Sequence, residues 1–287
     1  MEKFLLFFVL GFLSLTNAIE GGQEIEWDDA PYVVKIFARQ AMNKAEKAPP
    51  VKSCTGALIS PSLVLTDVEC IKNSTNRQDL EEIMITYHIY GSNRQVKVLA
   101  ETVEETDNWV LLKISPIDMK NVCPSEIDRE KMITRLNIKP SLTKDMKIQL
   151  SFNTVKNLRC RDFINKRDLY KMEMMSFDQD PKNMNRLAYT IDSNSTACIE
   201  DLGTALVCHY EGMNLQVGFL RSLQAYPSTL QAAMEIEDPQ IRSLAICAAT
   251  AKMLFVQIYN DDKLIEAIEK YDLGGFVNAY SACGFNQ

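Results

Sequence analysis

The sequence has few of the residues from which metal and redox sites are built. Only two histidines, His88 and His209, occur in 287 residues. Neither is accompanied by carboxylates or cysteines at metal-ligand spacing, and none of the eight cysteines form a CxxC pair. We therefore predict no metal site and no cofactor.

The sequence also lacks an excess of positive charge and, after its first residues, any long apolar run. Lys and Arg number 31 against 38 Asp and Glu, which gives a formal net charge of -7. Nucleic acid and anionic membrane surfaces require a basic face, so neither is expected as the main partner, although a local basic patch remains open. No later segment is long and apolar enough to span a membrane.

The first 18 residues have the features of a secretion signal. Lys3 precedes an apolar run over residues 4–15, which is too short to span a bilayer, and Thr16 and Ala18 are small residues at the positions that a signal peptidase inspects. We expect cleavage after Ala18 and a secreted, extracellular protein. In that oxidising route the eight cysteines indicate disulfides, and the sequons at Asn73 and Asn194 are candidate glycosylation sites.

Short runs of alternating apolar and polar residues, separated by turn residues, extend over residues 33–114. This pattern is typical of an all-β fold. Near the end of the chain, Leu264, Ile265, Ile268 and Tyr271 lie on one helical face behind a capping residue, Asn260 or Asp261. A packed helix is therefore expected at about 261–272.

Two motifs framed by cysteines resemble those of trypsin-like serine proteases. Residues 54–70 read CTGALISPSLVLTDVEC, similar to the family's CGGSLISPxWVLTAAHC, and residues 196–208 read TACIEDLGTALVC, similar to DSCQGDSGGPLVC. Residues 107–114 (DNWVLLKI) and 19–22 (IEGG) are similar to the family's NDIALLKL and IVGG. The resemblance covers nearly all of residues 19–287. It implies two packed six-stranded antiparallel β-barrels, at about 33–115 and 147–259, and a C-terminal helix.

The resemblance places three non-catalytic residues at the positions of the family's triad. Glu69 stands in place of the histidine, Asn108 in place of the aspartate and Leu202 in place of the serine. Leucine has no hydroxyl or thiol, a carboxylate is a poor base at neutral pH, and an amide carries no charge to stabilise an imidazolium. A shift of register that would substitute Asp107 for Asn108 is discounted, because it turns the side chain to the other face of a strand.

Other positions around this motif also depart from the family. Glu200 replaces a glycine of the oxyanion hole, where it puts a negative charge beside the place at which negative charge should develop. Thr196 occupies the position that sets primary specificity in trypsin. Met253 replaces a glycine that lines the same pocket, so the pocket is expected to be partly filled.

In the family the freed N-terminal ammonium pairs with the aspartate before the serine, here Asp201. Cleavage after Ala18 would make Ile19 the new N-terminus without a propeptide. A buried carboxylate needs such a cation. The alternative that Ile19 merely packs against the body stays open.

The resemblance also bears on the cysteines. It implies Cys54–Cys70 and Cys198–Cys247. The remaining four allow more than one connectivity, with Cys160–Cys208 and Cys123–Cys283 as the working assignment.

Three segments resemble the family only weakly. Residues 148–152 are expected to form the first strand of the second barrel, and residues 161–186, which are charged and rich in methionine, to form loops with a short helix and methionines in the core. Residues 223–246 include an insertion that is either a plug of the cleft, a contact surface or a tolerated loop.

The function that follows from this resemblance is that of a secreted, catalytically inactive serine protease homologue acting as a binding or regulatory protein. Its expected partner is an extracellular protein, with a protease or a component of a protease cascade as the candidate. The alternative is a serine-type endopeptidase with residual or unrecognised activity. Fold alone does not choose the biological process.

Overall fold

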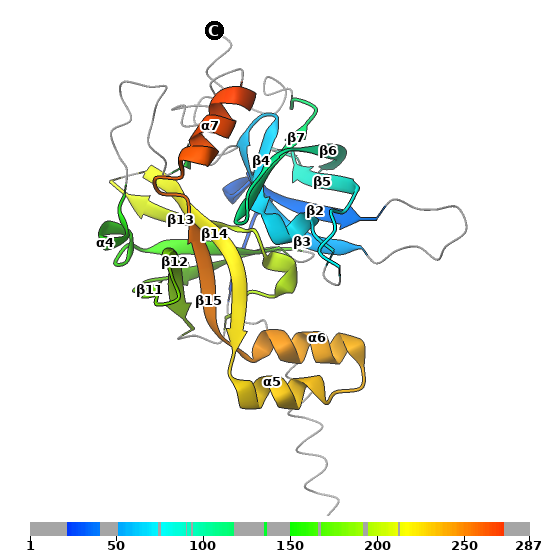
Figure 1. The fold of residues 1–287 in the computed structure, drawn as a ribbon, viewed down its shortest axis with the longest axis vertical. Coiled ribbons are helices and arrows are strands. Elements are labelled where there is room, and N and C mark those ends of the chain that lie inside the picture. The colour runs from blue at the N-terminus through cyan, green and yellow to red at the C-terminus, as the bar shows by residue number, and fades with distance from the viewer. Residues whose placement is uncertain are drawn as a thin grey trace, which may run out of the picture.

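The computed structural model describes residues 22–40, 51–73, 76–89, 91–92, 94–117, 135–136, 150–165, 168–191, 195–211 and 213–272. These residues form two β-rich halves with helices at the periphery (Figure 1). The predicted signal peptide, Ile19, Asn194, Cys123 and Cys283 lie outside the described residues.

The first half is a closed antiparallel barrel in the order β2-β3-β4-β7-β6-β5. Its six strands are β2 (Val33–Arg39), β3 (Lys52–Ser60), β4 (Leu63–Asp67), β5 (Glu82–His88), β6 (Gln95–Glu105) and β7 (Trp109–Ile114). Alternate β-branched and aliphatic side chains fill the interior, among them Val34, Ile36, Ile85, Val110 and Leu112. The predicted all-β class and its first barrel are confirmed.

The second half is a nine-stranded sheet in the order β1-β10-β9-β13-β14-β15-β12-β11, with β8 beside β14. Its strands are β1 (Gln23–Ile25), β8 (Arg135–Leu136), β9 (Cys160–Asn165), β10 (Leu169–Met174), β11 (Asp178–Asp180), β12 (Asn183–Thr190), β13 (Ala205–Tyr210), β14 (Met213–Ala225) and β15 (Thr250–Gln257). The β8–β14 pair is parallel, and the other pairs are antiparallel. Over the described residues this half is a sheet whose path ends at β1 and β11, where a second six-stranded barrel was expected.

The prediction of loops over residues 161–186 is wrong, because this segment contributes strands β9 to β12. Several of its charged side chains are partly exposed and pair across the strands: Arg161 is the register partner of Glu173, with Nε 3.2 Å from Oε1. The short helix lies earlier, at α4 (Phe152–Val155), so the strand predicted to reach residue 152 is also wrong.

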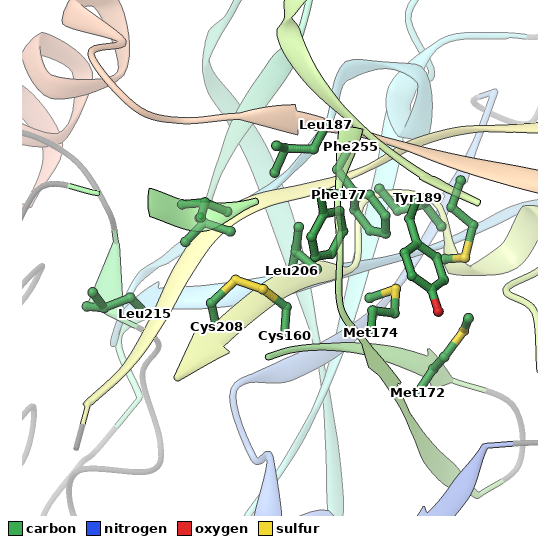
Figure 2. Packing of buried hydrophobic residues seen from close by; sticks show 14 of the residues in the cluster. Cys160, Met172, Met174, Phe177, Leu187, Tyr189, Leu206, Cys208, Leu215 and Phe255 are labelled. Atoms are coloured by element: carbon green, nitrogen blue, oxygen red, sulfur yellow. A yellow bond between two sulfur atoms is a disulfide. The ribbon is translucent and has the colours of Figure 1, made fainter. Parts of the chain in front are cut away.

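Two methionines of this segment do pack in the core, as predicted. Met172 and Met174 are two residues apart on β10, so they point to the same face and are buried. Figure 2 shows them beside Phe177, Tyr189 and the Cys160–Cys208 disulfide. Met175 and Met184, in contrast, are exposed.

The C-terminal helix packs across the two halves. Helix α7 (Asp262–Tyr271) begins one residue later than predicted, with the Asp261 side chain accepting a hydrogen bond from the Leu264 N–H at 3.0 Å. Leu264 and Ile268 share a core cluster with side chains of both halves, including Trp109 of β7 and Phe219 of β14. The helix therefore helps to fix one half against the other.

The insertion is a helical hairpin rather than a loop. Helix α5 (Pro227–Met234) follows β14, and helix α6 (Pro239–Ala248) leads into β15. Figure 1 shows the pair projecting from the end of the β14–β15 ribbon, at the opposite end of the molecule from α7. Pro227 and Pro239 open the helices at positions where a missing N–H costs nothing.

Three disulfides are present in the described residues. They join Cys54 to Cys70, Cys160 to Cys208, and Cys198 to Cys247, the same pairs that were expected. The Cys198–Cys247 bond ties helix α6 to the segment that precedes Leu202. The Cys123–Cys283 assignment stays a prediction.

Candidate functional site

The three residues predicted to stand at the triad positions lie near one another where the barrel contacts the second half. Glu69 lies in the 3-10 helix η2 (Val68–Ile71), Asn108 directly precedes β7, and Leu202 directly follows the 3-10 helix η3 (Ile199–Asp201). The Val68 N–H donates to Asn108 O at 3.3 Å, and the Thr55 N–H donates to Leu202 O at 2.9 Å. The Leu202 side chain packs against the cores of both halves.

Gly203 allows this close approach between the halves. Its φ of 83° lies in the left-handed region, and an added Cβ would lie 2.0 Å from Thr66 Oγ1 and 2.4 Å from Thr55 O. Thr55 Oγ1 also donates to Glu200 O at 3.1 Å. The loop that carries Leu202 is thus held directly against strands β3 and β4.

Arg221 of β14 occupies the centre of the site. Its Nη1 donates to Asp67 Oδ1 at 2.7 Å and to Asn108 O at 3.3 Å. Its Nη2 donates to Asp107 O at 3.1 Å and lies 3.4 Å from Glu69 Oε1. One guanidinium from the second half therefore binds two carboxylates and two carbonyls of the barrel.

Asp67 is the buried partner of Arg221. Its Oδ1 also accepts from the Glu69 N–H at 2.8 Å, whereas Oδ2 has no hydrogen-bond partner among the described residues. Burial raises the pKa of Asp67 to about 6, although Arg221 and the hydrogen bonds oppose the rise.

Glu69 accepts from a second arginine, Arg77, as well as from Arg221. The hydrogen bond from Arg77 is the largest of the effects that lower the pKa of Glu69. Lys52 Nζ donates to the carbonyl of Glu69 and to Lys72 O, the latter at 3.0 Å. We call the set of Arg77, Arg221, Asp67 and Glu69 the arginine clasp.

The backbone next to Leu202 is engaged inside the protein. The Leu202 N–H donates to Ile199 O at 3.3 Å within the η3 turn, and the Gly203 N–H donates to Leu220 O at 2.7 Å. The resemblance predicts that Leu202 stands at the position of the family's nucleophile, whose own N–H is one donor of an oxyanion hole. In this chain that N–H points back into its turn, and the neighbouring Glu200 is exposed.

Asp201 lies buried beneath this loop together with a second carboxylate. Its Oδ1 accepts from the Asn165 N–H and its Oδ2 from the Cys198 N–H, both at 2.8 Å. Asp162 is also fully buried. Its burial, together with the charge of Asp201, raises the pKa of Asp162 well above its usual range.

Thr196 and Met253, the two positions predicted for the degenerate specificity pocket, are both buried. Thr196 Oγ1 donates to the next carbonyl, Ala197 O, at 3.2 Å. Met253 of β15 belongs to the core cluster of the second half and lies between its register partners Tyr189 and Leu223.

Asn73, the first candidate glycosylation site, makes two backbone hydrogen bonds. Its N–H donates to Gln78 O at 2.7 Å and its carbonyl accepts from the Arg77 N–H at 3.0 Å. Within the described ranges no group of three or more His, Cys, Asp or Glu side chains could hold a metal ion. No helix in the same ranges is long and apolar enough to cross a membrane.

Sequence reasoning missed the role of Asp67 and Arg221. In the resemblance described above, Asp67 aligns with an alanine of the family's CGGSLISPxWVLTAAHC motif, so a charged residue is predicted where the family has a small apolar one. This charge was the available signal. It could not be interpreted without knowing that strands β4 and β14 come together.

No protein-family model and no curated protein matches the chain. Solved structures do. HL collagenase has a TM-score of 0.55 and 11% identity over 87% of this chain and 96% of its own. A thermostable serine protease, AL20, from an extremophilic microorganism has a TM-score of 0.50 and 9% identity over 83% of this chain and 95% of its own.

At such low identity these likenesses bear on the fold alone. They agree with the closed barrel and the second sheet. The chain has the fold of the trypsin-like serine proteases.

Proposed function

We propose that this chain is a secreted, catalytically inactive serine protease homologue that acts as a binding or regulatory protein. The observation that carries the proposal is the arginine clasp, which fills the place between Glu69 and Asn108 with a hydrogen-bonded guanidinium. An acyl-transfer site needs a nucleophile, a base and a free oxyanion hole at this place.

Each of those three requirements is opposed by a specific residue. Leu202 offers no attacking atom. Glu69 has a lowered pKa, which makes it a still weaker base. The Leu202 N–H is used by Ile199 O. These features favour a binding role over the alternative of a residual endopeptidase.

A fluorophosphonate probe tests the proposal on the secreted full chain. We expect no labelling, with trypsin as the positive control. Stoichiometric labelling of any serine that is abolished by a substitution in the site, or turnover of a peptide substrate with the same dependence, would overturn it.

Secretion is the second part of the proposal. The three disulfides of the described residues are consistent with an oxidising compartment. Mass spectrometry of the material recovered from culture medium should give Ile19 as the first residue and glycan on Asn73 or Asn194. Retention of the chain in cells with residues 1–18 attached would contradict this part.

The α-ammonium of Ile19 is proposed as the cation for Asp201. Strand β1 begins at Gln23 and pairs with β10, and the register partner of Asp162 on β10 is Met172, so the chain enters beside the two buried carboxylates. Two Ala residues inserted before Ile19 should lower the Tm by several degrees, whereas the same insertion after the last residue should not. An unchanged Tm would exclude the pairing.

A further inference from the structure

The α5–α6 hairpin carries half of the exposed large apolar side chains that the structure describes. Five of ten such residues lie in it or at its first residue. They are Tyr226, Leu230, Met234, Ile241 and Leu244, with exposed fractions of 62%, 37%, 57%, 48% and 38%. The other five are scattered over the rest of the chain.

These side chains are arranged in stripes. Tyr226, Leu230 and Met234 follow one another at intervals of four residues, and Ile241 and Leu244 are three apart, so each set shares one face of its helix. The stripes border the buried side of the hairpin, since the buried Ala233 lies three residues after Leu230 and the buried Cys247 lies three residues after Leu244. Apolar stripes of this kind are normally covered.

The tip of the hairpin is acidic. Glu235, Glu237 and Asp238 are exposed in the turn between the helices. The hairpin's one basic residue, Arg242, donates from Nε to Ile236 O at 2.7 Å and from Nη2 to Glu237 O at 2.9 Å. Its guanidinium is therefore used to close the turn.

The negative charge of the hairpin tip distinguishes between the partners that could cover the apolar stripes. A second copy would bring another acidic tip, on a chain with net charge -7, and an anionic lipid surface would be repelled in the same way. A partner with positive charge next to aliphatic side chains matches both features of the surface.

We propose that the apolar stripes of α5 and α6, with the acidic tip, form the docking surface for an amphipathic, basic segment of an extracellular protein. The inference rests on the proposed binding function and names its surface and partner class. The Cys198–Cys247 bond fixes the surface to the body next to the Leu202 loop. Binding uses the helix-against-helix mode, with aliphatic anchors on the stripes and lysines or arginines over the tip.

The test measures fluorescence anisotropy of two synthetic helical peptides with the secreted full chain. One peptide has a leucine face and a lysine face, and the other has the same leucines with glutamates in place of the lysines. We expect binding of the leucine–lysine peptide alone, at physiological ionic strength. No binding, or equal binding of both peptides, would overturn the proposal.

Variants assign any binding to the hairpin. Leu230→Ser/Met234→Ser/Ile241→Ser and Glu235→Gln/Glu237→Gln/Asp238→Asn should each weaken binding at least about tenfold. Leu99→Ser/Met184→Ser, which removes exposed apolar side chains elsewhere, is the matched control and should leave binding unchanged. Circular dichroism verifies that each variant is folded. Equal effects of the hairpin and control variants would contradict the assignment.

Other occupants have their own readouts. Sedimentation reports a second copy, and flotation with phosphatidylserine vesicles reports a lipid surface; stripe-dependent binding in either assay, without peptide binding, refutes the proposal. The fluorophosphonate result is independent of these assays. A labelled chain that still binds the peptide refutes the inactive function and supports the docking surface. An unlabelled chain that binds no peptide supports the inactive function and refutes the docking surface.

Discussion

The guanidinium of Arg221 binds two carboxylates and two carbonyls of the barrel, and its removal leaves the buried Asp67 carboxyl without its cation. In Arg221→Met, Asp67 keeps its burial and loses its cation. We expect the free energy of unfolding at pH 7.5 to fall by about 3–5 kcal/mol. Urea unfolding followed by fluorescence measures it, and the double variant Asp67→Asn/Arg221→Met should recover much of the loss. Equal stability of Arg221→Met and the wild type would show that the clasp is not formed.

The raised pKa of Asp67 gives the protein a pH dependence of defined sign. Its pKa of about 6 in the folded protein lies above the usual value of 3.8, so the favourable contribution is complete below the lower value and is lost as pH rises through the higher one. Relative to Asp67→Asn, the wild type should lose roughly 2 kcal/mol of unfolding free energy between pH 4 and pH 7.

The variant pair isolates Asp67 because Glu69, whose pKa is lowered, has the opposite pH dependence and is present in both proteins. Urea unfolding at half-unit pH steps, on wild type and Asp67→Asn in parallel, gives the difference. A constant difference across this range would contradict the raised pKa.

A serine at position 202 should not by itself restore catalysis. In Leu202→Ser there is no base, and the N–H of residue 202 still donates to Ile199 O. We expect no fluorophosphonate labelling and no amidase activity above the buffer rate. The informative comparison is between the triple variant Glu69→His/Asn108→Asp/Leu202→Ser and the same variant with Arg221→Ser added. Only the added Arg221→Ser removes the guanidinium from the site. Turnover by Leu202→Ser alone would contradict this account.

At the scale of elements, Asp261 does two tasks for α7. Its Oδ1 caps the helix, and its Oδ2 accepts from Trp109 Nε1 of β7 at 2.8 Å. Asp261→Ala should lower the free energy of unfolding by about 2–4 kcal/mol, since a cap is lost and a buried donor is left unpaired. Asp262→Ala, one residue further and exposed, is the control and should cost a few tenths of a kcal/mol. Chemical denaturation distinguishes the two; similar losses would argue against the double role.

Some elements could be predicted from the sequence and others could not, for physical reasons. The barrel strands carry a clear alternation, and α7 has both a cap and an apolar face, so local patterns were sufficient. Strands β9 and β10 were missed because Arg161, Lys171 and Glu173 have the composition of a loop, and become strand residues only through pairing across the sheet. The arginine clasp likewise joins residues more than 150 positions apart.

At the scale of the whole molecule, the two halves share enough buried contacts to unfold together. One shared cluster packs Leu65 and Trp109 of the barrel against Phe219 and Val256 of the sheet. A second cluster packs Val33 and Ala57 of the barrel against other side chains of the sheet. Native-state hydrogen exchange should therefore give the slowest amides of both halves the same opening free energy. Mass spectrometry of exchanged fragments measures it, with Arg221→Met as a comparison in which the two values shift together. Exchange of the barrel core while the sheet core stays protected would contradict a single cooperative unit.

The hairpin enters and leaves the body at Ala225 and Thr250, which are register partners on neighbouring antiparallel strands. Its two attachment points are thus separated only by the spacing of a β-ladder, about 5 Å. Any inserted segment whose two ends can lie at that spacing fits between β14 and β15. The length and composition of the insertion can therefore change without altering the registers of these strands. The framework of strands can therefore stay constant while the hairpin that it carries changes.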